Sequence, residues 1–443
     1  MDKQDLKKIL AEIEKEDRIF SKKSYLDNLT FPKNLIGREK KAKELVRFLA
    51  GYQKGLVVPF VSVYGRSGSG KSTVVRFVCE NLDGVEFGFV NLRAAKTIFG
   101  SANLILAELG RPNLKAASGL HSAIQQIGLA IRQKLDDSKK QLYVLVLDEF
   151  DVIFYDKRSK PSDFVYKLIA LEEELRHAGY QMCIIGISNN VVSEYDLDDR
   201  IKSRIGTSEV FFEPYSKDEV LKILRDRAKH AFSELIDPKI LEYCADLSSQ
   251  EHGDARRAID FLRVGAEIAS VSSEKLSKSH IDVAYEKLQN ERVIQVLSSA
   301  SYHLRLVCAS LARITFLSNQ DWHYTSTIYG QYQKIISKDT KPLTYRRVSE
   351  LLVELQNTGL LTGQTRSQGR HGYGTQYKLM YGPQLIGRAC FGKWWDEIEK
   401  QKKDHEFSIE KSNGFGSLSG RKNYFSLRLD KINKQIWDGY VGL

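Results

Sequence analysis

The feature that most constrains the fold is a glycine-rich run that joins an apolar segment to a helical one. Residues 65–72 have the sequence Gly-Arg-Ser-Gly-Ser-Gly-Lys-Ser, which fits G-x-x-x-x-G-K-[ST]. β-Branched and aromatic residues fill 55–64, and residues 71–81 follow with helical spacing. A strand, a glycine turn and a helix in this order predict a phosphate-binding loop. The alternative is a glycine turn with a chance lysine, which leaves both flanking elements unexplained.

Each residue type in this loop has a chemical reason to face phosphate. Glycines let the backbone curl so that N–H groups point at phosphate oxygens. Lys71 can reach the β- and γ-phosphates, and Ser72 can hold Mg²⁺. We therefore predict that ATP or ADP binds here with Mg²⁺, on Gly65, Arg66, Ser67, Gly68, Ser69, Gly70, Lys71 and Ser72.

An acidic pair follows a later apolar strand. Residues 144–147 are Val-Leu-Val-Leu, and Asp148 and Glu149 come next. Such a pair is often merely solvated, but downstream of a phosphate loop it matches the Walker B pattern. We predict that Asp148 holds the Mg²⁺ shell and that Glu149 orients the attacking water.

Three later polar positions fit the same site, and each has a plainer alternative. Asn189 ends a predicted strand and can sense the γ-phosphate, or it forms an ordinary turn. Arg204 can act on a neighbouring subunit's nucleotide as an arginine finger, or it is a surface arginine. Arg256 opens a predicted helix and can fold back onto the phosphates, or it belongs to a helix-cap cluster.

The order of elements predicts three folded parts. Strands at 55–64, 85–92, 142–147 and 182–188 alternate with helices, which indicates a parallel α/β sheet. Only helices follow, up to about residue 298. Three more helices, at 302–317, 324–337 and 344–358, then precede a β pair at 360–366 and 374–381, a winged-helix order. The predicted domains are 1–215 (nucleotide-binding α/β), 216–290 (helical lid), 291–390 (winged helix) and 391–443 (extension of unknown role).

The positive charge is concentrated in the last third of the chain. The formal net charge is +11, and residues 291–443 hold 22 Lys/Arg against 13 Asp/Glu. An excess placed in one domain favours an anionic partner such as nucleic acid. The alternative is that the charge serves solubility alone.

The predicted recognition helix and wing carry the candidate DNA contacts. Arg346 and Arg347 begin that helix, where a winged helix meets base edges and phosphates. Arg370 at the wing tip can enter a minor groove. Glu350 and Glu354, one turn apart, are expected to face away from DNA. The alternative is a protein-binding winged helix with solvated arginines. The predicted DNA-binding residues are Arg346, Arg347, Ser349, Arg370 and His371.

Together these runs resemble the archaeal origin-recognition and cell-division-control initiators, relatives of the eukaryotic origin recognition complex. The resemblance is carried by 65–72, 147–151, 186–189 and 251–263, the last reading Glu-His-Gly-Asp-Ala-Arg-Arg-Ala-Ile-Asp-Phe-Leu-Arg. Residues 32–39, which include Ile36, resemble the family's nucleotide-flanking segment, and 344–355 and 369–374 resemble its recognition helix and wing. The wing keeps only Arg370, followed by His371, and 391–443 with Trp394 and Trp395 has no recognised counterpart.

The resemblance implies a fold and residue roles. The fold is a P-loop AAA+ parallel-sheet domain with a helical lid, followed by a C-terminal winged helix. Asn189 and Arg256 would be the first and second sensors, and Arg204 would hold the finger position. Ile36 would flank the nucleotide, and a helical insertion at about 97–120 would touch DNA.

The resemblance also implies a function. The chain would be a slow ATPase whose nucleotide state controls binding to duplex origin DNA and recruitment of a replicative helicase, with other initiator paralogues as further partners. Two alternatives remain: an ATP-binding winged-helix regulator without a helicase-loading role, and a motor-like loader with fast turnover.

The remaining composition points to the cytoplasm. The five cysteines are scattered, with no C-x-x-C pair, which argues against a zinc site and a disulfide framework. The charged N-terminal residues do not resemble a secretory signal. Apolar runs fall short of the roughly 20 residues that span a bilayer. We expect a cytoplasmic, nucleoid-associated protein with no membrane partner.

Overall fold

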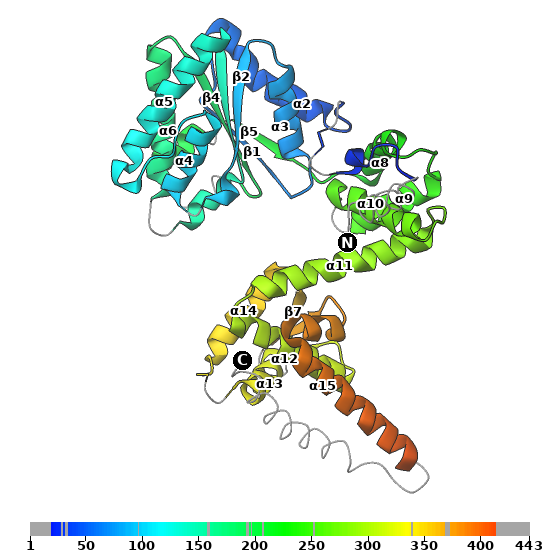
Figure 1. Cartoon of the computed structure of the whole chain (residues 1–443). Helices are drawn as coiled ribbons and strands as arrows, with labels where there is room; N and C mark the ends of the chain where they lie inside the picture. The colour runs from blue at the N-terminus through cyan, green and yellow to red at the C-terminus, as the bar shows by residue number, and fades with distance from the viewer. Residues whose placement is uncertain are drawn as a thin grey trace, which may run out of the picture. The chain divides into compact units, whose positions relative to one another are not determined.

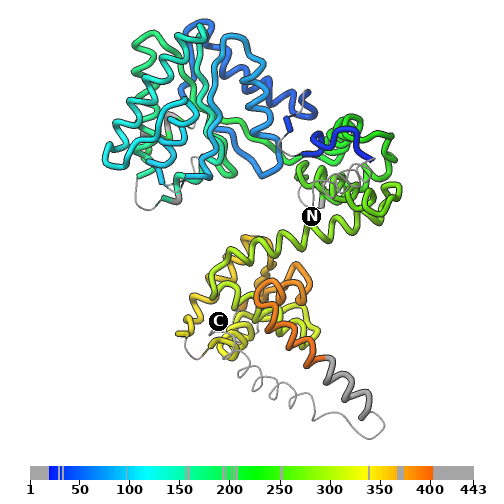
Figure 2. Tube along the Cα trace, in the orientation of Figure 1, coloured from blue at the N-terminus to red at the C-terminus, as the bar shows by residue number. Residues whose placement is uncertain are grey.

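The computed structural model describes most of the chain as two compact units, Met1–Ala284 and Tyr285–Leu443. Figures 1 and 2 trace the chain through both. Residues 1–18, in which charged and apolar residues alternate at helical spacing and so predict a helix, lie outside the described residues. These are 19–27, 30–31, 34–95, 97–156, 160–191, 195, 197–205, 208–250, 253–337, 340–367 and 373–412.

The first unit is built on a parallel five-stranded sheet. Its strand order is β2-β3-β4-β1-β5, so β1, which leads into the glycine-rich loop, lies inside the sheet. The predicted parallel α/β domain is therefore confirmed. The fifth strand was not expected, because it has only four residues and one of its phenylalanines, Phe211, is exposed. The strands are β1 (Phe60–Gly65), β2 (Val85–Asn91), β3 (Leu142–Asp148), β4 (Gln181–Ser188) and β5 (Glu209–Phe212).

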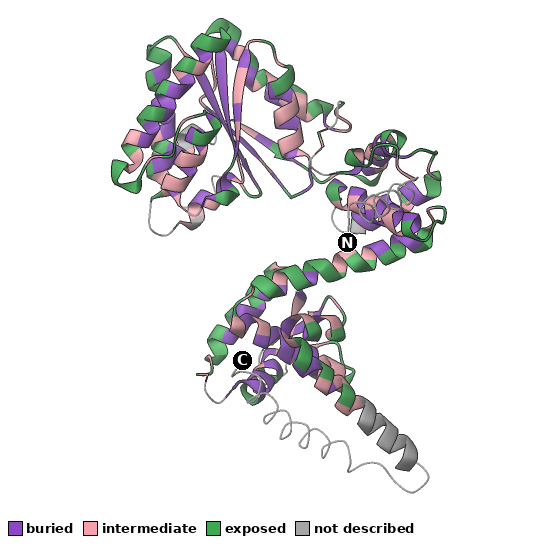
Figure 3. Ribbon diagram, in the orientation of Figure 1, coloured by how far each residue is buried: buried purple, intermediate pink, exposed green. Residues whose placement is uncertain are grey.

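Helices cover both faces of this sheet, which is why its strands are almost continuously apolar. On β3, Tyr143 and Leu145 pack into the core formed with α4, α5 and α6, whereas Val144 and Val146 pack into the core formed with α2 and α3. Figure 3 shows the buried strands between the helical layers. Those layers are α2 (Glu39–Leu49), α3 (Lys71–Asn81), α4 (Ile98–Glu108), α5 (Gly119–Ser138) and α6 (Pro161–His177); α7 (Asp199–Ile205) precedes β5.

The rest of the first unit is helical, as predicted for the lid. Ser216 starts it with a capping box, in which its hydroxyl accepts from Glu219 N and the Glu219 carboxylate accepts from Ser216 N. The N-terminal segment joins this part, since Phe20 bridges Phe232 and stacks on its ring. The lid helices are α8 (Lys217–Ala231), α9 (Pro238–Gln250) and α10 (Ala255–Val271), followed by α11 (Lys278–Ser299).

α11 differs from the sequence expectation. Separate helices were predicted at 278–290 and 291–298, but one helix runs from Lys278 to Ser299. No glycine or proline interrupts this stretch, so nothing in the backbone ends the helix at residue 290. The boundary between the two compact units falls within it, after Ala284.

The second unit is a winged helix, as predicted. Three helices pack around a core that includes Leu311, Tyr332 and Leu352, and an antiparallel sheet of order β6-β8-β7 forms the wing. Strand β6 was not expected, because it has two residues. The elements are α12 (Tyr302–Ser318), β6 (His323–Tyr324), α13 (Thr325–Ile335), α14 (Tyr345–Asn357), β7 (Leu361–Ser367) and β8 (Tyr373–Leu379).

The predicted C-terminal extension begins at Phe391, where a non-helical backbone (φ −153°, ψ 79°) interrupts the last helix of this core. α15 (Pro383–Ser412) packs on α12, and its Trp394, Trp395 and Ile398 are buried. The Trp395 ring fills the space where a Cβ on Gly387 would lie. No helix of the described chain is long and apolar enough to cross a membrane.

Candidate nucleotide site and DNA-facing helix

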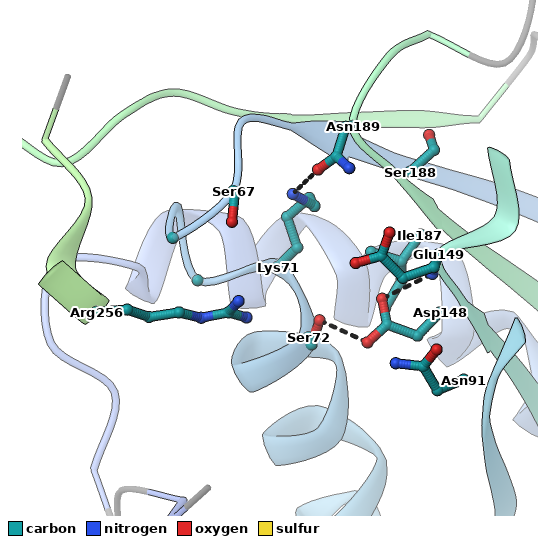
Figure 4. A pocket seen from close by; sticks show the side chains of 12 residues that line it. Ser67, Lys71, Ser72, Asn91, Asp148, Glu149, Ile187, Ser188, Asn189 and Arg256 are labelled. Atoms are coloured by element: carbon teal, nitrogen blue, oxygen red, sulfur yellow. Dashed lines mark hydrogen bonds between the residues drawn. The ribbon is translucent and has the colours of Figure 1, made fainter. Parts of the chain in front are cut away.

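Lys71 lies at the centre of the predicted phosphate loop. Its Nζ donates to Gly65 O (2.6 Å), Arg66 O (2.9 Å) and Asn189 Oδ1 (3.3 Å) (Figure 4). Burial, followed by the charge of Arg256, lowers the pKa of Lys71 from 10.5 to about 8. A buried cation so placed favours a neighbouring anion, which fits a nucleotide phosphate.

The loop needs its glycines for two separate reasons. Gly68 and Gly70 have φ values of 75° and 90°, which side chains rarely adopt. A Cβ at Gly68 would also overlap the Asp254 carboxylate, and one at Gly70 would overlap the Tyr215 hydroxyl. Asp254 and Tyr215 belong to the lid and to the segment before it, so the loop and the lid approach closely.

Two oxygen ligands lie together at the start of α3 and the end of β3. Ser72 Oγ donates to Asp148 Oδ2 at 2.9 Å, and the other carboxylate oxygen accepts from Glu149 N at 3.0 Å. Hydroxyl and carboxylate oxygens are ligands that Mg²⁺ prefers, usually completed by water and substrate phosphate. The residues present therefore fit the predicted metal.

Glu149 has an unusual backbone and a polar neighbour. Its φ is 53°, a left-handed conformation, and its carboxylate lies 3.9 Å from Arg93 Nη1. Burial, then Asp151 and Asp148, raises the pKa of Glu149 above its usual range. A carboxylate in that environment is a stronger base than an exposed glutamate, as a water-orienting residue requires.

A cavity of about 110 Å³ brings these groups together. Arg256 enters its lining from the lid helix α10, opposite the side formed by Asp148 (Figure 4). Asp254 caps this helix by accepting from Arg256 N at 2.9 Å, so cap and lining residue are neighbours. Asn91 also lines the cavity but was not predicted from the sequence. Its position at the end of β2 was the signal that could have indicated it. The lining residues are Ser67, Gly68, Gly70, Lys71, Ser72, Asn91, Asp148, Glu149, Ile187, Ser188, Asn189 and Arg256.

A second cavity, of about 310 Å³, shares part of that lining. Ile36, the predicted nucleotide-flanking residue, lies in it beside apolar side chains from the N-terminal segment and the lid. Size and apolar walls suit a heteroaromatic base. Sequence reasoning missed most of these residues because they come from distant segments: Phe31, Phe89, Tyr215, Ile223, Asp226, Arg227 and Ile259.

Arg38 was also missed, although it supports the loop. Its side chain is only 5% exposed, and its Nε donates to Ser69 O at 2.9 Å. Nη2 donates to Glu213 O at 2.6 Å. Ser69 itself is buried, with Oγ donating to Arg66 O at 2.8 Å. The buried guanidinium thus connects the loop to the segment that leads into the lid.

Three predicted site residues have side chains outside the described residues, and three others of the predicted nucleotide-binding set, Gly65, Arg66 and Ser69, line neither cavity. Arg204 lies near the end of α7, but its side chain is outside the described residues. Arg370 and His371 also fall outside them.

The DNA-facing candidate is α14, the helix that carries the two adjacent arginines. Thr344 caps it, and Val348 and Leu352 on its inner face are buried. The side chains of Arg346 and Arg347 are 91% and 53% exposed. Two exposed cations thus lie at the first turn, where a recognition helix enters a groove.

Glu350 and Ser349 lie on the same part of α14, and each makes hydrogen bonds within the helix. Glu350 was expected to face away from DNA; in the structure it lies beside the arginines and accepts from Arg346 Nε (3.3 Å) and from Arg347 Nη1 (2.8 Å). Helical spacing explains this pairing, because residues three and four positions apart are neighbours. Ser349 Oγ donates to Tyr345 O at 3.0 Å, so its hydroxyl proton is used within the helix.

Three family models match successive parts of the chain. Residues 59–190 match an AAA domain, 221–286 the Cdc6 AAA+ ATPase-type lid domain, and 295–389 the CDC6 C-terminal winged helix domain. Their order is that of the α/β sheet, the lid helices and the winged helix described above.

Relatives match over most of their length. The chain is 30% identical over 385 residues to an ORC1-type DNA replication protein of Thermococcus kodakarensis, covering 83% of this chain and 90% of that protein. It is 29% identical over 388 residues to ORC1-type DNA replication protein 1 of Archaeoglobus fulgidus, covering 84% and 90%. The Aeropyrum pernix ORC1 protein, solved in complex with DNA, superposes with a TM-score of 0.70 at 28% identity and covers 84% of this chain and 97% of that one.

These matches confirm the resemblance to archaeal replication initiators that the motifs indicated. The chain matches an AAA domain, a Cdc6-type lid and a CDC6 winged helix in that order. Together with the identity and coverage of the relatives, these matches assign the chain to one family. The chain belongs to the family of ORC1-type DNA replication proteins.

Proposed function

We propose that this replication protein is an ATP-controlled initiator that binds duplex origin DNA. The observation that carries the proposal is that Lys71, Asp148 and Arg256, from three different elements, line one cavity. A nucleoside triphosphate requires a cation at the loop, an oxygen ligand for Mg²⁺ and a second cation on the lid, and these three residues supply them.

The residues divide the work of holding and cleaving the nucleotide. Lys71 and the loop N–H groups bind the β- and γ-phosphates, while Ser72 and Asp148 hold Mg²⁺. Glu149 accepts a proton from water, which Asn189 helps to orient beside the γ-phosphate. Mg²⁺, when bound, supplies charge neutralisation on the phosphates. The larger cavity, with Ile36, receives the base.

Hydrolysis serves as a slow switch in this proposal. Arg256 belongs to α10 of the lid, whereas Lys71 belongs to α3 of the α/β domain. A nucleotide held by both favours one lid position over another, and loss of the γ-phosphate changes that preference. Arg204 would act on the nucleotide of a neighbouring copy or paralogue.

The winged helix supplies the DNA contact. Arg346 and Arg347 are exposed at the start of α14, and the A. pernix ORC1 relative was solved in complex with DNA. Arg370, His371 and Ser349 would also contact DNA in this proposal. The segment 97–120 adds a second contact from the AAA+ domain. Duplex binding places the protein at the nucleoid, where it recruits a replicative helicase.

Two measurements test the proposal. Lys71→Ala should abolish binding of fluorescent ATP and ADP, because the loop loses its cation, whereas Lys54→Ala, at an exposed site before β1, should not. Duplex binding by the full chain should weaken steeply with salt, and Arg346→Ala with Arg347→Ala should weaken it further. Unchanged nucleotide affinity in Lys71→Ala would contradict the proposed nucleotide site. Absence of duplex binding at low salt would contradict the proposed DNA binding.

A further inference from the structure

The first turns of α14 hold an ordered group of three charged side chains. Arg346 Nε donates to one carboxylate oxygen of Glu350 at 3.3 Å, and Arg347 Nη1 donates to the other at 2.8 Å. Each oxygen therefore holds a different guanidinium. We call Arg346, Glu350 and Arg347 the charged triad of α14.

The triad contributes little to folding. Its three side chains are 91%, 46% and 53% exposed in that order, and ion pairs in water stabilise proteins weakly. α14 is held instead by its buried face, with Val348, Leu351, Leu352 and Leu355. The effect of Glu350 must therefore be sought in what the exposed face meets.

Glu350 restricts the two arginines and keeps spare acceptor capacity. Arginine side chains at an exposed helix surface sample many rotamers, and a shared carboxylate reduces that freedom before any ligand arrives. An ionised carboxylate offers about four lone-pair positions, of which the arginines use two. The donors from Arg347 and Arg346 lower the pKa of Glu350, which favours its ionised form.

A carboxylate on this face distinguishes DNA sequences. Phosphates repel it whatever the sequence, so it weakens non-specific binding. In the major groove, guanine presents the O6 and N7 acceptors that arginine binds, and its cytosine partner presents an N4 amino donor that a glutamate accepts. An arginine and a glutamate held side by side thus match a G·C pair and oppose an A·T pair, whose amino donor lies on the purine and whose pyrimidine presents only an acceptor and a methyl group.

We infer that Glu350 is a specificity-determining residue, which fixes Arg346 and Arg347 in one arrangement and accepts from cytosine N4 at a G·C position of the recognised sequence. This inference rests on the proposed binding of duplex DNA by α14. It adds the residue that selects among sequences and the base-pair chemistry that it selects.

The chain offers a matched control on the same helix. Glu354 is exposed one turn further on, and its side chain has no ion-pair partner among the described residues. Glu350→Ala and Glu354→Ala remove the same charge from one helix, and alanine preserves helix formation. Comparable circular dichroism and thermal midpoints would show that both variants fold.

The experiment selects duplexes from a random pool with the full-length wild type and both variants, then measures affinities for the winning sequence and the unselected pool. Glu350→Ala should bind the pool several-fold more tightly and lose about tenfold of its preference at one G·C position. Glu354→Ala should keep the wild-type preference.

Two outcomes would overturn the inference while leaving DNA binding intact. Glu350→Ala selecting the wild-type sequence with the same preference would show that Glu350 reads nothing. Equal loss of preference in both variants would show a general effect of charge. Failure of the wild type to bind any duplex at low salt would be distinguishable from both, since it would remove the proposed function and this inference with it.

Discussion

The guanidinium of Arg38 stacks on the ring of Tyr215, with Cζ 3.6 Å from the ring centroid. The same guanidinium donates to Ser69 O in the phosphate loop and to Glu213 O before the lid. Gly70 lies against the Tyr215 hydroxyl, with no room for a Cβ. The stacked pair of Arg38 and Tyr215 therefore holds the phosphate loop to the segment that leads into the lid. This makes Arg38 a positioning residue for the nucleotide site.

Arg38→Ala should lower both stability and nucleotide affinity. Two carbonyls, of which Ser69 O is buried, lose a charged donor, a cost of about 3 kcal/mol that corresponds to a fall of roughly 5–10 °C in the thermal unfolding midpoint. Calorimetry and titration with fluorescent ATP measure the two effects. Arg47→Ala, at an exposed position of α2, should move the midpoint very little. Equal shifts in the two variants would contradict the role given to Arg38.

Nucleotide affinity should decrease as pH rises through about 8. Lys71 has its pKa lowered to about 8 in the nucleotide-free protein, so it loses its proton above that pH. Phosphate contact favours the protonated form, and binding above pH 8 must therefore take up a proton. Affinity should fall by up to about tenfold per pH unit. Dissociation constants between pH 7 and pH 10 measure this.

Lys71→Arg provides the control for that pH dependence. Its guanidinium stays charged throughout the range, so the variant should show a nearly flat profile whatever its absolute affinity. A wild-type affinity that is the same at pH 7 and pH 9.5 would mean that Lys71 does not face the phosphates.

Glu149→Gln should separate binding from hydrolysis. The metal ligands Ser72 and Asp148 remain, so ATP should bind as in the wild type. Loss of the base should slow phosphate release at least about a hundredfold. Single-turnover hydrolysis and equilibrium binding give the two quantities. Asp148→Asn should instead weaken Mg²⁺-dependent binding itself. If Glu149→Gln loses binding and hydrolysis together, the two acidic roles are misassigned.

The winged helix should not fold if it ends at residue 390, one residue past the family match. A fragment of residues 285–390 lacks Trp394, Trp395 and Ile398, all of which lie in its core. A fragment of residues 285–412 should unfold cooperatively in urea and the shorter one should not.

Within the longer fragment, Trp395→Ala should cost about 3–5 kcal/mol. Met380→Ala, at a side chain that is 57% exposed, should cost less than about 0.5 kcal/mol. If the shorter fragment unfolds as cooperatively as the longer one, the residues of α15 from Trp394 onward are not needed for the fold.

The parts of the fold and of the site that could be predicted from the sequence are those whose signals lie within one short segment of the chain. The phosphate loop and the pair Asp148 and Glu149 each lie between a strand and the next element, and both strands are apolar enough to be recognised alone. The second cavity could not be predicted, since Phe31 and Ile259 meet only through the tertiary fold.

Two features that were not predicted had signals in the sequence. Glu350 stands three and four positions after its two arginines, which is the spacing of helical ion pairs. Ile386, Cys390, Trp394 and Ile398 recur every fourth residue and all four are buried, although the non-helical backbone of Phe391 (φ −153°, ψ 79°) separates the first two from the last two. The apolar residues after 390 were the available signal that the winged-helix core continues past that position.

The place of β1 inside the sheet has a consequence for the synthesis of the protein. β1 pairs with β4 and β5, so residues 60–65 find their partners only at 184–188 and 209–212. At translation rates of about 5–20 residues per second, this apolar strand waits on the order of ten seconds after leaving the ribosome. ATP cannot stabilise the nascent chain during that interval, because the loop after β1 has no sheet to hold it. The newly made first half of the chain therefore depends on chaperones or on fast completion to avoid aggregation.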